Sequence, residues 1–198
     1  VTQRLALDRG LGPIDTFSIG LEGGPDLAPA RAVAESLGTR HHEYTFTIDE
    51  AMAALPSVVH HLESDQQVRT GVPTCLLAQR VRADGFKMVL SGEGADELFG
   101  GYLYFQAAPD PAAFHAETVR KATRLHQYDV MRANKAPMAF GLEVRVPFLD
   151  RAVIDEALGT DPADRMIDPG RDGAPIEKAL LRSAFHDPDD PWLPDEVL

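Results

Sequence analysis

The first 90 residues alternate segments typical of strands with segments typical of helices, and this alternation limits the folds open to the chain. Residues 14–21 alternate β-branched or aromatic side chains with polar ones before a glycine-rich turn, which predicts a strand. The further predicted elements are strands 43–47 and 86–90 and helices 27–37, 49–62 and 72–82. Asp26 and Asp49 are the expected helix caps. Because strands separated by helices favour parallel pairing through right-handed crossovers, we predict an α/β fold with a parallel sheet.

From Asp110 onward helical patterns dominate, with Pro111 expected in the first helical turn. The predicted helices are 114–126, 128–140, 150–158 and 174–185. Residues 161–172 are rich in Asp, Pro, Gly and Arg and predict a mobile surface loop, and the acidic residues 186–198 predict a solvated loop. The two expected parts of the chain are an α/β part at 1–108 and a helical part at 109–198.

The chain carries 31 Asp and Glu against 19 Lys and Arg, a formal net charge of −12 over 198 residues. This charge repels phosphate backbones and anionic lipids, so we expect small-molecule partners, no nucleic acid and no membrane. Cys75 is the single cysteine and lies in an apolar stripe predicted to face the core, which excludes an intrachain disulfide and fits a reducing cytoplasm. Because the chain starts without a methionine or a secretion signal, we expect it to be a fragment of a longer protein.

Residues 91–102, Ser-Gly-Glu-Gly-Ala-Asp-Glu-Leu-Phe-Gly-Gly-Tyr, combine four glycines with three carboxylates directly after the last predicted strand. Open α/β sheets bind ligands at the carboxyl edge of their strands, and glycines let the backbone approach phosphate oxygens closely. A carboxylate beside phosphate needs a divalent cation between them, so Asp96 or Glu97 indicates Mg²⁺. The alternative is a strand–turn–helix connection whose acidic residues only complement the first helical turn.

Segment 91–102 resembles the signature of the synthetase domain of glutamine-dependent asparagine synthetases. The resemblance extends over nearly the whole chain, through segments 17–21, 38–43, 117–121, 132–135 and 143–150. It implies a parallel sheet of the adenine nucleotide alpha hydrolase (ATP pyrophosphatase) type followed by a helical cluster. It also implies that ATP and Mg²⁺ serve to adenylate aspartate with release of pyrophosphate, after which ammonia derived from glutamine displaces AMP. The expected partners are thus aspartate, ATP and glutamine or ammonia, and a homodimer is a further expectation.

The resemblance also implies roles for residues at matching positions. Ile19 resembles the residue whose backbone reads adenine, and Ser91 with Gly92 resembles the pair beside the nucleotide. Asp96 matches the acid that holds Mg²⁺ and pyrophosphate. Glu93 matches the carboxylate linked to formation or breakdown of the aspartyl-adenylate, where a base or a charge partner for ammonia is needed.

Three further residues are candidate substrate contacts. Arg69 lies in a segment that resembles the aspartate-binding loop, where an arginine can clamp a carboxylate, and a surface arginine is the alternative. Glu143 and Arg145 resemble positions near the reacting centre, and the alternative is that they pair with each other or support the helical cluster.

The family's phosphate loop, Ser-Gly-Gly-x-Asp-Ser, does not occur among the 198 residues. We expect this loop, the glutaminase domain and a later lysine-bearing loop in sequence outside the chain, so the polypeptide alone should be inactive. Two other interpretations stay open. One is a related adenylating ligase such as a β-lactam synthetase, although such relatives tend to carry tyrosine in place of Glu93. The other is a degenerate, non-catalytic module for interaction or regulation.

Overall fold

The computed structural model describes residues 1–167, 176–190 and 192–193. The chain divides into two compact units, which are Val1–Lys87, Lys135–Leu142 and Phe185–Leu198 for the first and Met88–Asn134 and Glu143–Ala184 for the second. Helix α7 (Asp129–Met138) belongs in part to each unit. The predicted border at residue 108, between an α/β part and a helical part, stays a prediction.

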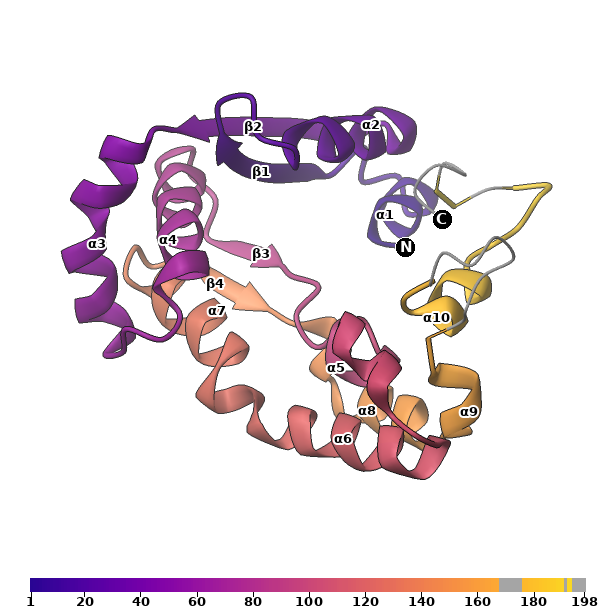
Figure 1. Ribbon diagram of the computed structural model, residues 1–198. Coiled ribbons are helices and arrows are strands. Elements are labelled where there is room, and N and C mark those ends of the chain that lie inside the picture. The colour runs from indigo at the N-terminus through magenta and orange to yellow at the C-terminus, as the bar shows by residue number, and fades with distance from the viewer. Residues whose placement is uncertain (168–175, 191, 194–198) are drawn as a thin grey trace. The chain divides into compact units, whose positions relative to one another are not determined.

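A pair of parallel strands organises the first unit. Its elements are α1 (Thr2–Asp8), β1 (Asp15–Leu21), α2 (Leu27–Leu37), β2 (Arg40–Phe46), α3 (Ile48–Leu62) and α4 (Val68–Ala83). Strands β1 and β2 pair in parallel over their whole length, and α2 connects them. Helices α2 and α4 both pack against this strand pair (Figure 1). The parallel strand–helix–strand arrangement predicted for this part is confirmed.

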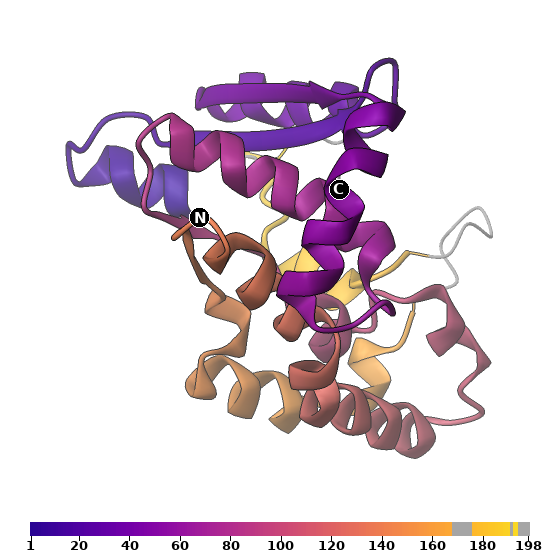
Figure 2. The same ribbon diagram turned by 90° about the vertical axis from the view of Figure 1, so that its left-hand side faces the viewer.

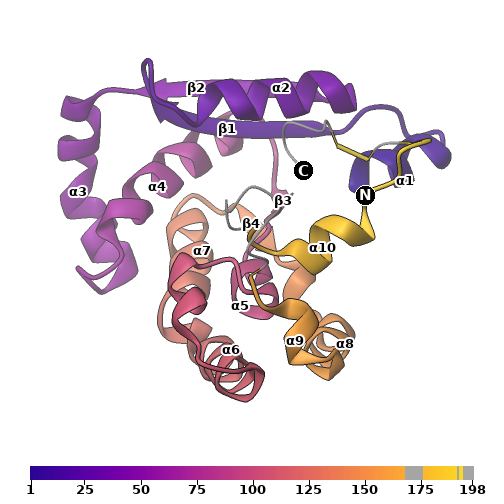
Figure 3. The same ribbon diagram turned by 45° about the vertical axis from the view of Figure 1, so that its right-hand side comes forward.

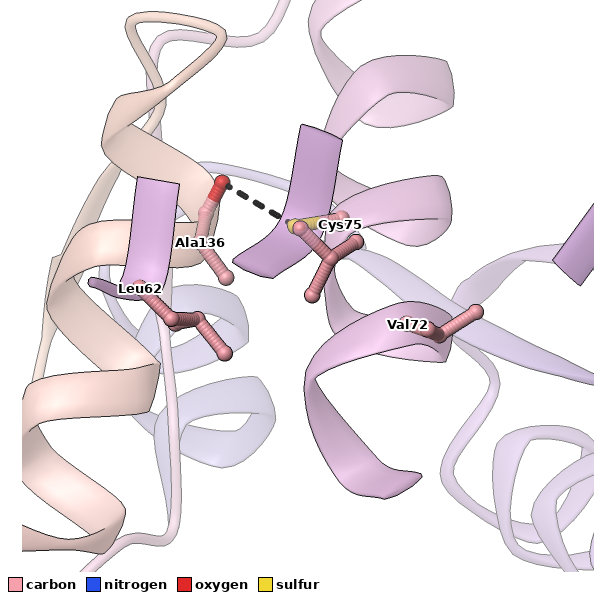
Figure 4. Packing of buried hydrophobic residues seen from close by; sticks show 5 residues of the cluster. Leu62, Val72, Cys75 and Ala136 are labelled. Atoms are coloured by element: carbon pink, nitrogen blue, oxygen red, sulfur yellow. Dashed lines mark hydrogen bonds between the residues drawn. The ribbon is translucent and has the colours of Figure 1, made fainter. Parts of the chain in front are cut away.

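Helices α3 and α4 lie side by side and supply the buried cluster of the first unit (Figure 2). Val58 and Leu62 of α3 pack with Val72 and Cys75 of α4 and with Ala136, and none of the five is more than 7% exposed. The Cys75 thiol donates a weak hydrogen bond to the Ala136 carbonyl over 3.8 Å (Figure 4). Burial raises the pKa of Cys75 to about 11, so the thiol is a protonated core residue at neutral pH, as the sequence predicts.

The second unit surrounds a second strand pair with helices. Its elements are β3 (Met88–Leu90), α5 (Ala95–Phe99), the 3₁₀-helix η1 (Leu103–Ala107), α6 (Pro111–Arg124), η2 (Leu125–Gln127), β4 (Glu143–Arg145), η3 (Pro147–Leu149), α8 (Arg151–Gly159), α9 (Pro162–Arg165) and α10 (Ala179–Ala184). The short helix α5 lies among α6, α8 and α10 (Figure 3). Asp110 caps α6 by accepting a hydrogen bond from the Ala113 amide at 2.8 Å, with Pro111 in the first turn, so that helix start is confirmed.

Some predicted boundaries are wrong because of local hydrogen bonding. Helix α3 is capped by Thr47, which accepts a hydrogen bond from the Glu50 amide while the Glu50 side chain accepts one from the Thr47 amide. Asp49 therefore lies in the first turn and is not the cap. Asp26 occupies the cap position of α2, but its side chain makes no capping bond. Strand β2 starts three residues before the predicted 43–47, because Arg40 already pairs with Asp15.

The third predicted strand does not extend the first sheet. Strand β3 pairs in parallel with β4, a segment for which the sequence predicts no strand, so the described residues contain two two-stranded parallel sheets. Helix α9 lies inside the predicted loop 161–172, because Asp161 caps it with Pro162 in its first turn. Residues 168–172 of that loop, and 174–175 of the last predicted helix, are outside the described part of the chain. The predicted solvated loop is confirmed at 186–190, which are exposed and in no helix or strand.

Candidate functional site

The signature segment 91–102 folds as a strand end, a turn and a helix. The Ser91 amide donates to the Arg145 carbonyl at 2.9 Å, which continues the pairing of β3 with β4. The chain then turns at Gly94, whose φ of +97° disfavours any side chain. A Cβ at residue 94 would also lie 2.4 Å from Leu149 Cδ2, so both conformation and packing require glycine. The turn thus holds the segment at the carboxyl ends of two parallel strands.

The first turn of α5 carries two carboxylates with different surroundings. The Glu97 side chain is buried, and it accepts a hydrogen bond from the Tyr102 hydroxyl at 2.5 Å. Burial and this bond raise the pKa of Tyr102, which keeps the hydroxyl a donor. Asp96 is 42% exposed, and its Oδ1 accepts a hydrogen bond from Lys178 Nζ at 2.5 Å. Glu97 is therefore a structural residue, and Asp96 is the carboxylate that a ligand can reach.

Glycine at residue 101 makes room for the Asp96 carboxylate. A Cβ at this residue would lie 1.9 Å from Asp96 Oδ1 and 2.9 Å from Asp96 Cα. The Gly101 amide also donates to the Asp96 carbonyl at 2.9 Å, so the chain folds back over the start of α5. This close approach fixes where the Asp96 carboxylate can point.

Glu93 lies in the turn before α5 and forms an ion pair with α7. Arg132 Nη2 is 2.6 Å from Glu93 Oε1, and Arg132 Nη1 is 3.2 Å from Asp129 Oδ1. The side chains of Glu93, Arg132 and Asp129 are 23%, 13% and 25% exposed. Burial raises the pKa of the Glu93 carboxyl above its ordinary value, and the Arg132 charge opposes that rise. Glu93 is thus a half-buried, ion-paired carboxylate and not a loop side chain that faces solvent.

Glu143 and Arg145 lie on β4, beside the strand that leads into the signature turn. Arg145 is opposite Leu90, and Arg145 Nε is 2.8 Å from Glu143 Oε1. Both side chains are more than half exposed, so they pair with each other at the surface. The structure thus brings these two residues to the strand pair that leads into Ser91, Gly92 and Glu93.

Ile19 and Arg69 belong to the first unit. Ile19 is in β1 opposite Tyr44 and is partly buried. Arg69 is in the first turn of α4 and is exposed, and no residue in the described part of the chain pairs with it.

The donor set around Asp96 can be tested for Mg²⁺. Among the described residues, no group of three or more His, Cys, Asp or Glu side chains is placed to hold a metal ion. Asp96 offers a single accessible carboxylate, and Lys178 already occupies one of its oxygens. Mg²⁺ usually binds one or two protein carboxylates and fills its shell with water and phosphate oxygens. The residues therefore fit a Mg²⁺ ion that binds together with a phosphate group, and do not form an all-protein cage.

Sequence reasoning missed the two cations that hold the signature carboxylates. Arg132 lies in a segment that contributes to the family resemblance, and its spacing of three from Asp129 on a predicted helix is a usable signal for an ion pair. Lys178 is 82 residues from Asp96 in the sequence, and no local pattern predicts that contact.

The family model described as asparagine synthase matches residues 2–111 and 106–198. The "Asparagine synthetase [glutamine-hydrolyzing]" of Asparagus officinalis is 50% identical over 187 residues, which cover 93% of this chain and 31% of the relative. The protein of the same name from Brassica oleracea is 50% identical over 192 residues, covering 94% and 32%. The "Asparagine synthetase, root [glutamine-hydrolyzing]" of Pisum sativum is 48% identical over 187 residues, covering 93% and 32%. The chain spans just under a third of the length of these curated relatives.

None of the helices in the described ranges combines the length and apolar character that crossing a bilayer requires.

Proposed function

Because the chain belongs to the asparagine synthase family, we propose that the protein that carries it makes asparagine from aspartate with ATP. In the first step an aspartate carboxylate oxygen bonds to the α-phosphorus of ATP, and pyrophosphate leaves. In the second step ammonia derived from glutamine forms a C–N bond to the acyl carbon, the C–O bond to AMP breaks, and a proton is released.

The observation that carries this proposal is the presence of two carboxylates in different surroundings, three residues apart in the signature segment. Glu93 is half-buried beside Arg132, and Asp96 is partly exposed beside Lys178. Carboxylates in different surroundings can take different chemical roles at one pH. Here Glu93 accepts the proton released from the attacking ammonia, and Asp96 faces the phosphate groups.

Mg²⁺ is the cofactor of this proposal. Asp96 holds it, and when bound it supplies positive charge against the phosphate oxygens. Lys178 keeps the Asp96 carboxylate in place and adds a second positive charge beside it. These positive charges offset the repulsion between the Asp96 carboxylate and a polyphosphate.

The other predicted residues keep the roles that the resemblance implies. Ser91 and Gly92 lie beside the nucleotide, and a Cβ added at Gly92 would have nothing within 4 Å. The Ile19 backbone reads adenine. Arg69 binds the aspartate carboxylate, a role that its exposed and unpaired guanidinium permits within the described residues. Glu143 and Arg145 act as one ion-paired unit near the substrate.

The proposal extends to the fold and domain organisation of the larger protein. It assigns the ATP pyrophosphatase fold to this chain, which the parallel β1–β2 pair supports. It places an α/β nucleotide-binding part at 1–108, a helical part at 109–198, and the glutaminase domain and the phosphate loop outside this chain. It also takes the protein to be cytoplasmic and homodimeric.

The test uses the protein at its full encoded length with ATP, Mg²⁺ and aspartate, and with either glutamine or ammonia. Aspartate-dependent pyrophosphate release and asparagine are measured, and both are expected. No aspartate-dependent pyrophosphate from a folded protein would refute the proposal.

The variant Glu93→Gln removes the proton acceptor and keeps the size of the side chain. Asparagine formation is expected to fall by about 100-fold or more, because general-base catalysis contributes on that order. Glu117→Gln is the matched control, since Glu117 also pairs with an arginine in the second unit but lies on α6. Equal activity of Glu93→Gln and Glu117→Gln would remove Glu93 from the mechanism.

A further inference from the structure

Arg132 is shared between two carboxylates of the second unit. One terminal nitrogen is 2.6 Å from Glu93 Oε1 and the other is 3.2 Å from Asp129 Oδ1. The guanidinium is the least exposed of the three groups, at 13%. A planar guanidinium can hold two partners at fixed angles, which an ammonium cannot do. The contact therefore fixes direction as well as charge.

The arrangement leaves one oxygen of Glu93 available. Oε1 accepts from Arg132, and within the described residues Oε2 has no hydrogen-bond partner. The negative charges of Asp129 and Glu97 disfavour the ionised form of Glu93. The positive charge of Arg132 favours that form. Without Arg132 the half-buried carboxylate would lose both its charge partner and its orientation.

We infer that Arg132 is a positioning residue that holds Glu93 with Oε2 directed to the reacting amine, and that Asp129 holds Arg132 in turn. This inference rests on the proposed function, since it gives Glu93 the role of proton acceptor. It adds a residue that touches neither ATP nor aspartate and acts only through Glu93. A purely structural ion pair between the turn and α7 is the alternative.

The two explanations differ in which reaction step a substitution of Arg132 should slow. In Arg132→Gln the amide-forming step should slow by about 100-fold, because misplacement of a catalytic group by about 1 Å costs on that order. KM for aspartate and ATP, and aspartate-dependent pyrophosphate release in a single turnover without ammonia, should change by less than about threefold. Arg132→Lys keeps the charge but cannot reach both carboxylates, so it should recover about a tenth of the wild-type rate.

A double-mutant cycle in the full-length protein tests the inference. If Arg132 acts through Glu93, the double variant Glu93→Gln with Arg132→Gln should be no slower than Glu93→Gln alone. Arg120→Gln is the matched control, because Arg120 binds Glu117 through two contacts of 2.6 Å in the same unit, and its rate should stay within about twofold of wild type. Thermal unfolding of each variant shows whether it is folded, and Asp129→Asn replaces Arg132→Gln in the cycle if the latter does not fold.

Each outcome decides between the explanations. A non-additive cycle with pyrophosphate release retained supports the inference. Additive losses, or equal loss of both steps, overturn the inference and leave the proposed function standing. Wild-type protein without aspartate-dependent pyrophosphate overturns the proposed function and the inference together.

Discussion

Replacing Gly94 with alanine should destabilise the signature turn by an amount that the structure determines. The residue has φ of +97°, and a left-handed conformation costs an L-residue about 1–2 kcal/mol. The added Cβ would lie 2.4 Å from Leu149 Cδ2 and 2.8 Å from Leu149 Cγ, and such overpacking costs about 1–3 kcal/mol. The two costs add to about 2–5 kcal/mol for Gly94→Ala. Because Glu93 precedes this residue, its carboxylate should move as well.

Hydrogen exchange of the α5 amides measures this cost locally. A loss of about 2–5 kcal/mol should speed their exchange by about 25- to 4,000-fold, since about 1.4 kcal/mol corresponds to tenfold. Gly92→Ala is the control, because nothing lies within 4 Å of its added Cβ and its φ is not in the left-handed region. Its effect should stay within about 0.5 kcal/mol.

A companion variant separates the two causes. Leu149→Ala removes the two atoms that the new Cβ would approach within 3 Å and leaves only Phe148 Cβ, at an ordinary contact distance of 3.5 Å. Adding Gly94→Ala to it should therefore cost only the conformational part, about 1–2 kcal/mol. Exchange in Gly94→Ala as slow as in Gly92→Ala would refute the argument. A full cost of Gly94→Ala in the Leu149→Ala background would refute the steric part alone.

Two further predictions concern one carboxylate in each unit. In the second unit, Gly101→Ala would bring a Cβ to 1.9 Å from Asp96 Oδ1 and should displace that carboxylate. Mg²⁺-dependent pyrophosphate release should fall by about tenfold or more in a protein that still unfolds cooperatively, and unchanged release would contradict the proposed role of Asp96. In the first unit, hydrogen bonds from Arg40 and His42 lower the pKa of Asp15 to about 2 from 3.8. Because the folded value is the lower one, the stabilisation is present above pH 3.8 and is lost as pH falls through about 2. The melting temperatures of wild type and Asp15→Asn should therefore differ at pH 7, by the equivalent of about 1 kcal/mol, and converge toward pH 2, whereas a difference that persists at pH 2 would contradict this explanation.

The parts of the fold that depend on local sequence could be predicted. The alternation in residues 15–21 and the apolar spacing in α2 are local patterns, and both elements form as predicted. The cap of α3 was missed even though it is local, because Thr47 and Asp49 both precede the helix pattern and only one can occupy the cap geometry. Helix α9 was missed because its Asp and Pro residues also suit a loop.

For the candidate site, the sequence identifies the chemistry but not the partners. The glycines and carboxylates of residues 91–102 indicate a phosphate-compatible turn, and the structure forms that turn. The same sequence does not show that Glu97 is buried under Tyr102 while Asp96 is accessible. Which face of a five-residue helix is covered depends on the elements packed around it, and these come from distant parts of the chain.

The sequence by itself determines the family, the charge and the turn chemistry of this protein, because residue types and short spacings carry that information directly. Only the tertiary structure decides which cation holds which carboxylate. Lys178 reaches Asp96 across 82 residues and Arg132 reaches Glu93 across 39, and such contacts form only when helices pack. The same holds for the pairing of β3 with β4, since a three-residue strand has no pattern long enough to specify its partner. Local backbone preferences are thus determined by neighbouring residues, whereas the surroundings of Glu93 and Asp96 arise from long-range packing.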